Sequence, residues 1–539
     1  MRLTAEGLKQ RKDWEAENIA LPDYDVQEVS DRTRKAPVWL HLGIGNIFRI
    51  FMGGIAGQLI RQGAMDRGII CGETFDYEIV DRIFSPHDNL ALGVILHGDG
   101  TEERRVLGSM AEAVKAKWDE PESWERLKEI FCDPGLQMVS FTITEKGYGL
   151  TKTDGTYTEM VQNDMENGPQ RAVSAMAVTA AMLLERYRSG KWPIALVSMD
   201  NCSKNGEKLG DAVRTVAEEW IKRGYADEGF LAYLSDETQV SFPWTMIDKI
   251  TPRPSERTAK ELEDAGVEGM MPIVTAKHTY IAPFVNAEGP QYLVVEDRFP
   301  NGRPPLEKAG VYMTDRDTVN QSERMKVTAC LNPIHSALGP YGCLLGYELF
   351  SDEMNDPDML ALARLVGYGE GLQAAPDPKI LSPKKFLDEV LNERFPNPYL
   401  GDTTQRLCVD LSQMVGIRFG ETIKTYVSRY GDAKKLIGIP LAVAGWLRYL
   451  LAVDDEGTPF ALAPDPMIPE LQKRMEGISF GDPASVGEKL RPILSETSIF
   501  GMDLYAAGIG ERIEEMFCRE IKGPGAIRKT VQTYLSSGE

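Results

Sequence analysis

The residues best suited to chemistry in this sequence lie between Lys326 and His335, in the segment KVTACLNPIH. Lysine and histidine can accept or release a proton, and an asparagine amide can donate a hydrogen bond to an oxygen. Asn332 and His335 are three residues apart and share one face if the segment is helical. Pro333 suits the first turn of that helix, with Asn332 near its cap. Lys326 must then precede the helix, or lie beyond a bend, if it reaches the same ligand as His335.

Taken singly, Asn332 and His335 also have a structural explanation. An asparagine before a helix is a good N-cap, and a lone histidine is often a buried residue whose hydrogen bonds are satisfied. For either residue alone, the structural explanation is the simpler one. The case for chemistry depends on other groups elsewhere in the chain.

A second polar group, Asn201 and Asn205, follows the apolar run 194–199 in the segment VSMDNCSKNG. If that run is a strand of an open α/β sheet, both amides lie beyond its carboxyl end, where ligands bind in such sheets. Asn and Asn-Gly are also common in turns. The two amides are therefore candidate ligand-binding groups, with a simple turn as the alternative.

Gly43 and Gly45 form two thirds of a dinucleotide-binding fingerprint, with Phe48 where the third glycine falls. The first glycine permits a tight turn, and the second lets a cofactor pyrophosphate approach the backbone. The helix that follows offers its unpaired N–H groups to the phosphates. We expect Gly43, Gly45, Asn46, Ile47 and Phe48 to hold the cofactor; a strand-to-helix turn without a ligand is the alternative.

Glu73 ends the next apolar run, 68–73, thirty residues after Gly43. A carboxylate at about this distance hydrogen-bonds the adenosine ribose in dinucleotide-binding folds. It also repels the additional phosphate of NADP, so it favours NAD. Asp76, three residues later, is the rival for the ribose contact.

The elements that must position these residues are short apolar runs alternating with helical periodicity. Runs at 38–42, 68–73, 137–143 and 194–199 predict buried parallel strands. Between the first two, apolar residues recur at helical spacing and end before a C-capping glycine. Strand, glycine turn, helix and strand together form one βαβ unit.

Further along the chain the periodicity becomes almost wholly helical, from about Ser351 onward. The fold class we expect is α/β: an N-terminal Rossmann-like doubly wound sheet domain followed by a mainly α-helical C-terminal domain. The first would take residues 1–295, including a polar N-terminal extension over residues 1–35. The second, over residues 296–539, would be the substrate and catalytic domain, with the boundary near 285–305.

Composition and charge exclude several function classes. The 539 residues are 42% hydrophobic and 26% charged, as in globular proteins, and 81 acidic against 60 basic residues give a net charge of −21. Nucleic-acid binding needs clustered cations and is not expected. The apolar run 436–453 contains a proline and an arginine and predicts a buried helix rather than a membrane span.

Seven scattered cysteines contain no C-x-x-C pair, and no His/Cys/Asp cluster has zinc spacing. These features favour a protein of the reducing cytoplasm without a disulfide framework or a bound metal. The charged N-terminus lacks the apolar core of a signal peptide. The sequence does not indicate an oligomeric state.

Six segments of the chain resemble one family in the same order. The chain is similar to the polyol-specific long-chain dehydrogenases, the group of mannitol 2-dehydrogenase and fructuronate (D-mannonate) reductase. The resemblance covers about residues 38–350, and a weaker match, DTTQR, continues it at 402–406. The segments are HLGIGNIFR, ITEKGYGL, VSMDNCSKNG, SFPWTMIDKITP, VVEDRFPNGRPPLEKAGV and KVTACLNPIHSALGPYGCLLGY.

The resemblance implies a role for each matching residue. Lys326 matches the catalytic lysine, and Asn332 with either Asn201 or Asn205 matches an oxyanion pair of asparagines. His335 matches a histidine that orients the substrate. Asp248 and Arg406 match residues that line the substrate pocket.

Two departures from the family pattern concern spacing and charge. The family's lysine-to-asparagine spacing is usually one residue shorter than that from Lys326 to Asn332. The family often has a lysine near position 414, where this chain has Met414. Both departures put the substrate contacts in doubt more than the reaction type.

The chemistry implied is NAD-dependent interconversion of a secondary alcohol and a ketone. The cofactor accepts the hydride, and Lys326 takes the hydroxyl proton once burial or a nearby cation has disfavoured its ammonium form. The asparagine amides stabilise the developing alkoxide without titrating. The lysine thus replaces a metal as the activating group.

Substrate choice depends on the cation available for a carboxylate. A sugar acid needs a cationic clamp, for which Arg406 is the candidate and Arg418 the reserve. We expect D-mannonate/D-fructuronate, with D-mannitol/D-fructose as the runner-up and another polyol or hexonate, such as tagaturonate, as a further option. The non-enzymatic alternative is a nucleotide-sensing Rossmann protein, which gives no role to Lys326.

Overall fold

The computed structural model describes residues 1–152 and 154–536. The chain divides into two compact units. Unit 1 consists of residues 1–96 and 101–320, and unit 2 of residues 97–100 and the chain from residue 321 onward.

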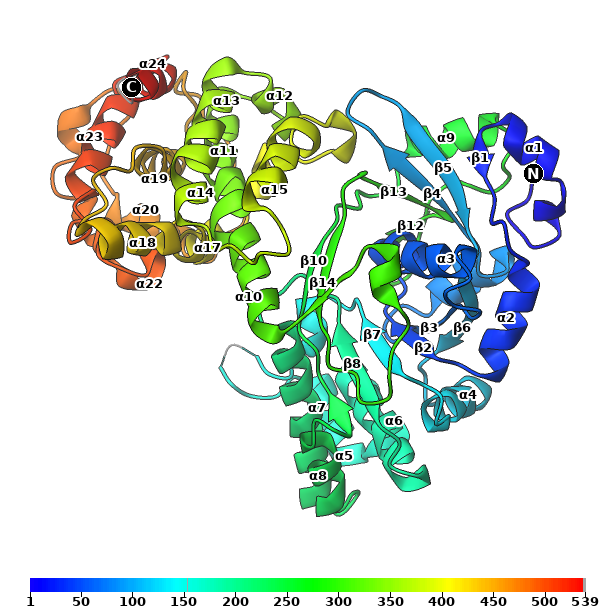
Figure 1. Cartoon of the computed structure of the whole chain (residues 1–539). Coiled ribbons are helices and arrows are strands. Elements are labelled where there is room, and N and C mark those ends of the chain that lie inside the picture. Colours follow the sequence, from blue (N-terminus) through cyan, green and yellow to red (C-terminus); the bar gives the residue numbers. More distant parts are fainter. Residues whose placement is uncertain (153, 537–539) are drawn as a thin grey trace. The chain divides into compact units, whose positions relative to one another are not determined.

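Unit 1 is built on a six-stranded parallel sheet in the order β6-β3-β2-β7-β8-β9 (Figure 1). Numbered along the chain, this is the 3-2-1-4-5-6 order of doubly wound dinucleotide-binding sheets, with the reversal of order at β2. The strands expected at 38–42, 68–73, 137–143 and 194–199 are confirmed. The strands are β2 (Trp39–Leu42), β3 (Ile69–Glu73), β6 (Met110–Lys115), β7 (Met138–Phe141), β8 (Ile194–Ser198) and β9 (Val240–Ser241).

The sheet strands are short and apolar because helices cover both of their faces. β2, β3, β7 and β8 are buried along their whole length. One core lies around α4 and α6, and another around α3. The helices of unit 1 are α1 (Arg11–Ala16), α2 (Val26–Lys35), α3 (Gly53–Arg61), α4 (Pro121–Cys132), α5 (Glu159–Asn167), α6 (Ala175–Ser189), α7 (Asn205–Lys222), α8 (Glu228–Ser235) and α9 (Glu256–Asp264).

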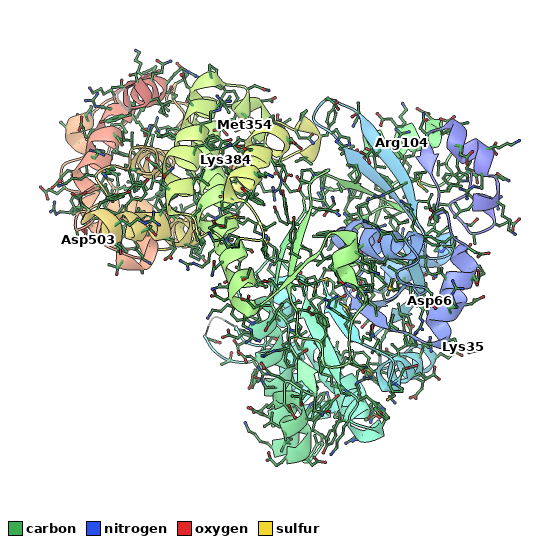
Figure 2. The ribbon with its side chains drawn as sticks, viewed as in Figure 1. Lys35, Asp66, Arg104, Met354, Lys384 and Asp503 are labelled. Atoms are coloured by element: carbon green, nitrogen blue, oxygen red, sulfur yellow. The ribbon has the colours of Figure 1, made fainter. Side chains whose placement is uncertain are left out.

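A second, four-stranded sheet anchors the N-terminal extension, in the order β1-β5-β4-β13. The side chains of Leu3, Trp14 and Ile19 are buried in a core with this sheet, which confirms that the extension packs on the first domain. Figure 2 labels Arg104 on β5, where its guanidinium pairs with Glu102 at 3.0 Å. The strands are β1 (Ile19–Ala20), β4 (Ala91–Leu96), β5 (Glu102–Leu107) and β13 (Phe284–Ala287).

Residues 296–320, which the sequence analysis placed with the helical half, belong to unit 1. The reason is a three-stranded sheet in the order β10-β14-β15. β15 pairs in parallel with β14 and thereby keeps this stretch in unit 1. The strands are β10 (Thr245–Asp248), β14 (Tyr292–Glu296) and β15 (Tyr312–Thr314), and a small hairpin joins β11 (Ile273–Val274) to β12 (Tyr280–Ile281).

Unit 2 is mainly helical, as the periodicity after Ser351 predicts. The apolar run at 436–453 is a helix, α19, whose residues are all buried. The helices are α10 (Arg316–Met325), which begins in unit 1, α11 (Asn332–Leu345), α12 (Phe350–Met354), α13 (Pro357–Arg364), α14 (Leu372–Ala374), α15 (Pro383–Glu389), α16 (Thr404–Leu407), α17 (Leu411–Arg418), α18 (Gly420–Tyr430), α19 (Gly438–Tyr449), α20 (Ile468–Arg474), α21 (Arg491–Leu494), α22 (Thr497–Phe500), α23 (Gly510–Glu520) and α24 (Ala526–Ser536).

Helix α11 is fixed against α19 and α23 through Tyr341. A Cβ atom on Gly445 would come within 2.4 Å of the Tyr341 ring, so this close approach of α19 requires glycine. The Tyr341 hydroxyl lies at hydrogen-bonding distance from two acceptors, the Leu441 carbonyl at 2.7 Å and Glu520 Oε1 at 2.6 Å, which share its single proton. Burial raises the pKa of Glu520 to about 8. The helix that carries Asn332 is therefore held by buried polar contacts as well as by apolar packing.

Candidate active site

The glycine turn after β2 has the conformation that a dinucleotide requires. Gly43 has φ +93°, and a Cβ there would lie 2.3 Å from the Thr142 carbonyl oxygen, so only glycine fits. A Cβ on Gly45 would meet no atom within 4 Å. The first glycine is needed by the protein's own turn, whereas the second leaves open space beside the backbone. These are the two roles expected of the fingerprint glycines.

Phe48 takes the place of the third glycine by filling the space between helix and sheet. Its ring is fully buried and stacks on His41 of β2, with centroids 4.2 Å apart and planes at 15°. Burial lowers the pKa of His41 to about 3, so this imidazole is neutral. Phe48 thus supports the turn from inside the protein. Ile47 is partly exposed beside it.

Asn46 is tied to a buried arginine that the sequence analysis did not single out. Arg49 is fully buried, and its Nη2 donates to Asn46 Oδ1 at 2.6 Å, while its Nη1 donates to the Ala282 carbonyl at 2.7 Å. Burial lowers the pKa of Arg49 to about 9. A cation therefore lies beneath the start of the helix and adds to the positive field that phosphates favour. The signal for it was its position three residues after Asn46.

Glu73 ends β3, as expected, and its carboxylate is already bonded to the backbone. Oε1 accepts from the N–H groups of three consecutive residues, 74–76, at 2.8–3.2 Å. Oε2 accepts from the N–H of Ile44 in the glycine turn at 3.2 Å. Burial raises the pKa of Glu73, and these four bonds oppose the rise. Glu73 therefore joins the two loops that follow β2 and β3, a role that its sequence position alone did not indicate.

Asp76, the rival for the ribose contact, is also buried. Its Oδ2 accepts from Thr275 Oγ1 at 2.6 Å. Its Oδ1 is a buried oxygen without a hydrogen-bond partner in the described residues. An unsatisfied buried acceptor is costly, and a ligand hydroxyl would satisfy it. The ribose assignment stays a prediction for both carboxylates.

The two asparagines after β8 have different environments. Asn205 is 1% exposed, and its amide is saturated: Nδ2 donates to Thr245 Oγ1 at 2.8 Å, and Oδ1 accepts from the Thr245 N–H at 3.0 Å. It fastens the start of α7 to β10. Asn201 is exposed in the preceding loop. Asp248, the predicted pocket residue, is partly buried at the end of β10.

Lys326 precedes helix α11 and is separated from it by a bend, as the spacing requires. It begins a π-helical turn, Lys326–Cys330, that ends at Leu331, where the backbone leaves the helical region at φ −134° and ψ −66°. Only 1% of Lys326 is exposed. Burial of this kind disfavours an ammonium ion, which is the condition that the lysine base needs.

A π turn lies within the interval whose spacing departs from the family pattern. The Leu331 N–H donates to the Lys326 carbonyl five residues earlier, at 3.1 Å. A π turn contains one residue more than an α turn. Such a turn has room for one additional residue between Lys326 and Asn332 without a loop.

Asn332 and His335 lie on the first turn of α11, with Pro333 in that turn, as predicted. The simpler explanations for both residues fail. Asn332 makes no capping hydrogen bond, and its Oδ1 is buried without a partner in the described residues. His335 is 8% exposed, and its Nε2 is likewise buried without a partner. Two polar atoms on one helix face therefore lack the bonds that a purely structural role would supply.

His335 is held in an aromatic and cationic environment. Its ring packs on Phe395 at 4.5 Å and edge-on against Phe350 at 5.0 Å between centroids. Burial, and then three arginines at 418, 406 and 394, hold the pKa of His335 well below its usual range. The imidazole is therefore neutral at physiological pH and can orient a hydroxyl or carbonyl oxygen by a hydrogen bond.

Arg406 and Arg418, the two candidates for binding a substrate carboxylate, have different partners. Arg406, in α16, is 62% exposed and forms an ion pair with Asp402. Arg418, at the end of α17, is partly buried and donates from Nη1 to Ser336 Oγ at 2.7 Å. Met414, at the position where the family often has lysine, lies one turn before Arg418 on the same helix. Ser336, directly after His335, is a contact that the sequence analysis missed.

In residues 1–152 and 154–536, no three side chains of His, Cys, Asp or Glu are grouped so that they could hold a metal ion. Over the same residues, no helix combines the length and the apolar character that a bilayer crossing demands.

Two family models match the chain. The mannitol dehydrogenase Rossmann domain matches residues 38–308, and the mannitol dehydrogenase C-terminal domain matches residues 318–517. The chain belongs to the mannitol dehydrogenase family. Assignment to this family confirms the resemblance and the fold class, and it makes the chain a dehydrogenase rather than a nucleotide-sensing protein.

Relatives of this mannitol dehydrogenase family member cover nearly the whole chain. D-mannonate oxidoreductase of Thermotoga maritima is 49% identical over 538 residues, 99% of each chain. Mannitol 2-dehydrogenase of Aspergillus fumigatus is 29% identical over 92% of this chain and 93% of its own. The solved structure of Pseudomonas fluorescens mannitol 2-dehydrogenase, a ternary complex with NAD and D-mannitol, has a TM-score of 0.70 at 25% identity, covering 100% of this chain and 99% of its own.

Proposed function

We propose that this dehydrogenase interconverts D-mannonate and D-fructuronate, with NAD as the hydride carrier. The observation that carries the proposal is the 49% identity to a D-mannonate oxidoreductase along 99% of both chains. The mannitol 2-dehydrogenase relatives match at 28–30% identity. The difference in identity favours the sugar acid over the neutral polyol.

NAD fits the residues around the glycine turn. The open space beside Gly45 can take the pyrophosphate, and the helix start at Asn46, with Arg49 beneath it, suits its charge. Glu73 or Asp76 would hold the adenosine ribose, and a carboxylate there disfavours the additional phosphate of NADP. When bound, NAD supplies the hydride acceptor for alcohol oxidation and, when reduced, the hydride donor for ketone reduction.

The proton is handled by groups of unit 2. In the oxidative direction, the neutral Lys326 amine accepts the proton of the substrate hydroxyl. In the reductive direction, the ammonium form returns it to the carbonyl oxygen. The burial of Lys326 supports this role because it favours the neutral amine.

Asn332 and His335 would orient and stabilise the reacting oxygen. The Asn332 amide donates to the developing alkoxide, and its unpaired Oδ1 can accept a bond from a neighbouring substrate hydroxyl. His335 offers the unpaired Nε2, and its neutral state lets it bind oxygen without competing for the proton that Lys326 carries. We assign the second amide of the oxyanion pair to Asn201, because the Asn205 amide is already saturated.

The test is an NADH-consumption assay with D-fructuronate, D-tagaturonate and D-fructose under identical conditions. We expect D-fructuronate to give the highest kcat/KM, and NADPH to be a poorer donor than NADH. A higher kcat/KM for fructose would replace the proposal with mannitol 2-dehydrogenase activity, the second candidate. The matched control is Lys326→Met, which removes the proposed base but keeps a side chain of similar length. A cytoplasmic location stays a prediction.

A further inference from the structure

A cation without a partner of opposite charge lies beside the candidate catalytic histidine. The Arg418 guanidinium donates one hydrogen bond, from Nη1 to Ser336 Oγ at 2.7 Å. Within residues 1–152 and 154–536, no carboxylate forms an ion pair with it, and its other N–H groups have no acceptor. Burial is the cause that lowers the pKa of Arg418, to about 10. No acidic side chain in the described part of the chain forms an ion pair that would offset this loss of hydration.

Other arginines in the chain show how this protein normally satisfies a buried or clustered guanidinium. Arg186 is fully buried and donates to five backbone carbonyl oxygens. Arg406 is paired with Asp402 and is largely exposed. Within the described residues, Arg418 has neither backbone carbonyl acceptors like those of Arg186 nor a carboxylate partner like that of Arg406. Its remaining donors are therefore available to a ligand, and a planar guanidinium suits a carboxylate that accepts two parallel bonds.

The potential around His335 is positive although the protein is acidic. Three arginines, including Arg418, act on His335 to lower its pKa. The chain as a whole carries a net charge of −21. Of the three, Arg418 forms no ion pair in the described residues, so its charge is suited to a negatively charged ligand.

The neighbouring atoms suit a ligand that is also hydroxylated. Ser336 directly follows His335 on α11, so the hydroxyl that holds Arg418 also fixes its position relative to the imidazole. His335 Nε2 and Asn332 Oδ1 are buried and unpaired on the same helix turn. One helix turn therefore presents hydrogen-bonding atoms for hydroxyl or carbonyl oxygens, and through Ser336 it positions a cation.

We infer that Arg418, oriented by Ser336, binds the carboxylate of the sugar-acid substrate, while Arg406 remains paired with Asp402. The inference rests on the proposed function, because among the candidate substrates only the sugar acids carry a carboxylate. The inference assigns the substrate carboxylate to Arg418, the second candidate of the sequence analysis, instead of Arg406, the first. Arg418 is thereby the residue that makes the enzyme prefer hexonates and hexuronates to neutral polyols.

The experiment compares Arg418→Gln with the matched control Arg406→Gln. For each we would measure kcat/KM with D-fructuronate and with D-fructose, the NADH dissociation constant and Tm. Arg418→Gln should lower kcat/KM for fructuronate by about 10- to 150-fold, and that for fructose by less than about threefold. Arg406→Gln should change kcat/KM for the two substrates by the same factor, because its guanidinium remains paired with Asp402 and does not bind the carboxylate. Equal losses on the two substrates in Arg418→Gln, or a fructuronate-selective loss in Arg406→Gln, would overturn the inference.

A binding measurement separates this inference from the proposed function. Titration calorimetry of the enzyme–NADH complex would use D-gluconate, an acyclic sugar acid, and its neutral counterpart D-glucitol. If the wild type fails to reduce fructuronate but prefers gluconate, and Arg418→Gln removes that preference, the proposed substrate is wrong and the carboxylate site stands. Equal binding of gluconate and glucitol by the wild type would overturn the site itself.

A second pair of variants covers the case in which Arg418→Gln does not fold. Ser336→Ala keeps the guanidinium but removes its anchor, and it should raise KM for fructuronate about two- to tenfold. In Arg418→Ala, added guanidinium ion should restore fructuronate turnover but leave fructose turnover unchanged. An unaltered KM in Ser336→Ala together with no rescue in Arg418→Ala would contradict the assignment.

Discussion

Replacement of Lys326 tests whether a buried lysine is the base of this dehydrogenase. The side chain is 1% exposed, so Lys326→Ala leaves a space the size of propylamine. General-base catalysis contributes about 10²- to 10⁴-fold, which is about 2.7–5.4 kcal/mol of activation free energy. We expect kcat to fall by that factor in Lys326→Ala and in Lys326→Met. NADH binding should persist in both, because the nucleotide turn lies in unit 1.

The assay adds small primary amines to both variants and follows NADH at 340 nm. Propylamine can enter the space left by Lys326→Ala and should restore turnover by about tenfold or more, with saturation. In Lys326→Met the thioether side chain fills that space, and the amine should have no effect. Activity of Lys326→Met within about tenfold of the wild type would refute the lysine base, as would equal stimulation of both variants by the amine.

Three further predictions concern the cofactor, the oxyanion pair and the pH dependence of stability. Glu73→Ser or Asp76→Ser should narrow the preference for NAD over NADP, whichever binds the ribose; if neither changes the ratio of the two kcat/KM values, the ribose carboxylate lies elsewhere. Asn201→Ala should lower kcat by about 10²- to 10³-fold with an unchanged Tm, whereas Asn205→Ala should mainly lower Tm; the opposite pattern would reverse the assignment. The pKa of Glu520 is raised from its ordinary 4.5 to about 8, so its stabilising contribution is complete below about pH 4.5 and is lost as pH rises through 8. Glu520→Gln should therefore flatten the decline of Tm between pH 5 and pH 8, and parallel Tm profiles for the two proteins would show that this carboxyl is not responsible.

The framework could be predicted from sequence because its signals are local. Short apolar runs ended by glycine or an acid predict the strands of the central sheet, and the helical spacing after Gly45 predicts the helix that follows. Gly43 could be assigned its tight turn from position alone. The role of Phe48 in place of the third glycine could not be predicted, because its stacking partner His41 lies on the preceding strand. Nothing in the local pattern states that an aromatic pair replaces a fingerprint glycine.

The candidate site was predictable as a set of residues but not as a set of contacts. Asn201 and Asn205 are equivalent in sequence, and only the bonds from the start of α7 to Thr245 of β10 show that the Asn205 amide is occupied. Arg418 and Ser336 are 82 residues apart, so their hydrogen bond has no sequence signal. The sequence likewise could not show that unit 1 continues after residue 296, because parallel pairing between β14 and β15 is not a local pattern.

The π turn at Lys326–Cys330 has a consequence for how this chain is compared with its relatives. An inserted residue in an α-helix normally rotates everything after it by about 100°, which would turn Asn332 away from Lys326. Here one wide turn closed by the Leu331 N–H spans the interval, and such a turn contains one residue more than an α turn. Pattern searches with a fixed lysine-to-asparagine spacing will miss such members of the family. Alignment by helix register rather than by residue count keeps the lysine and the asparagine in correspondence.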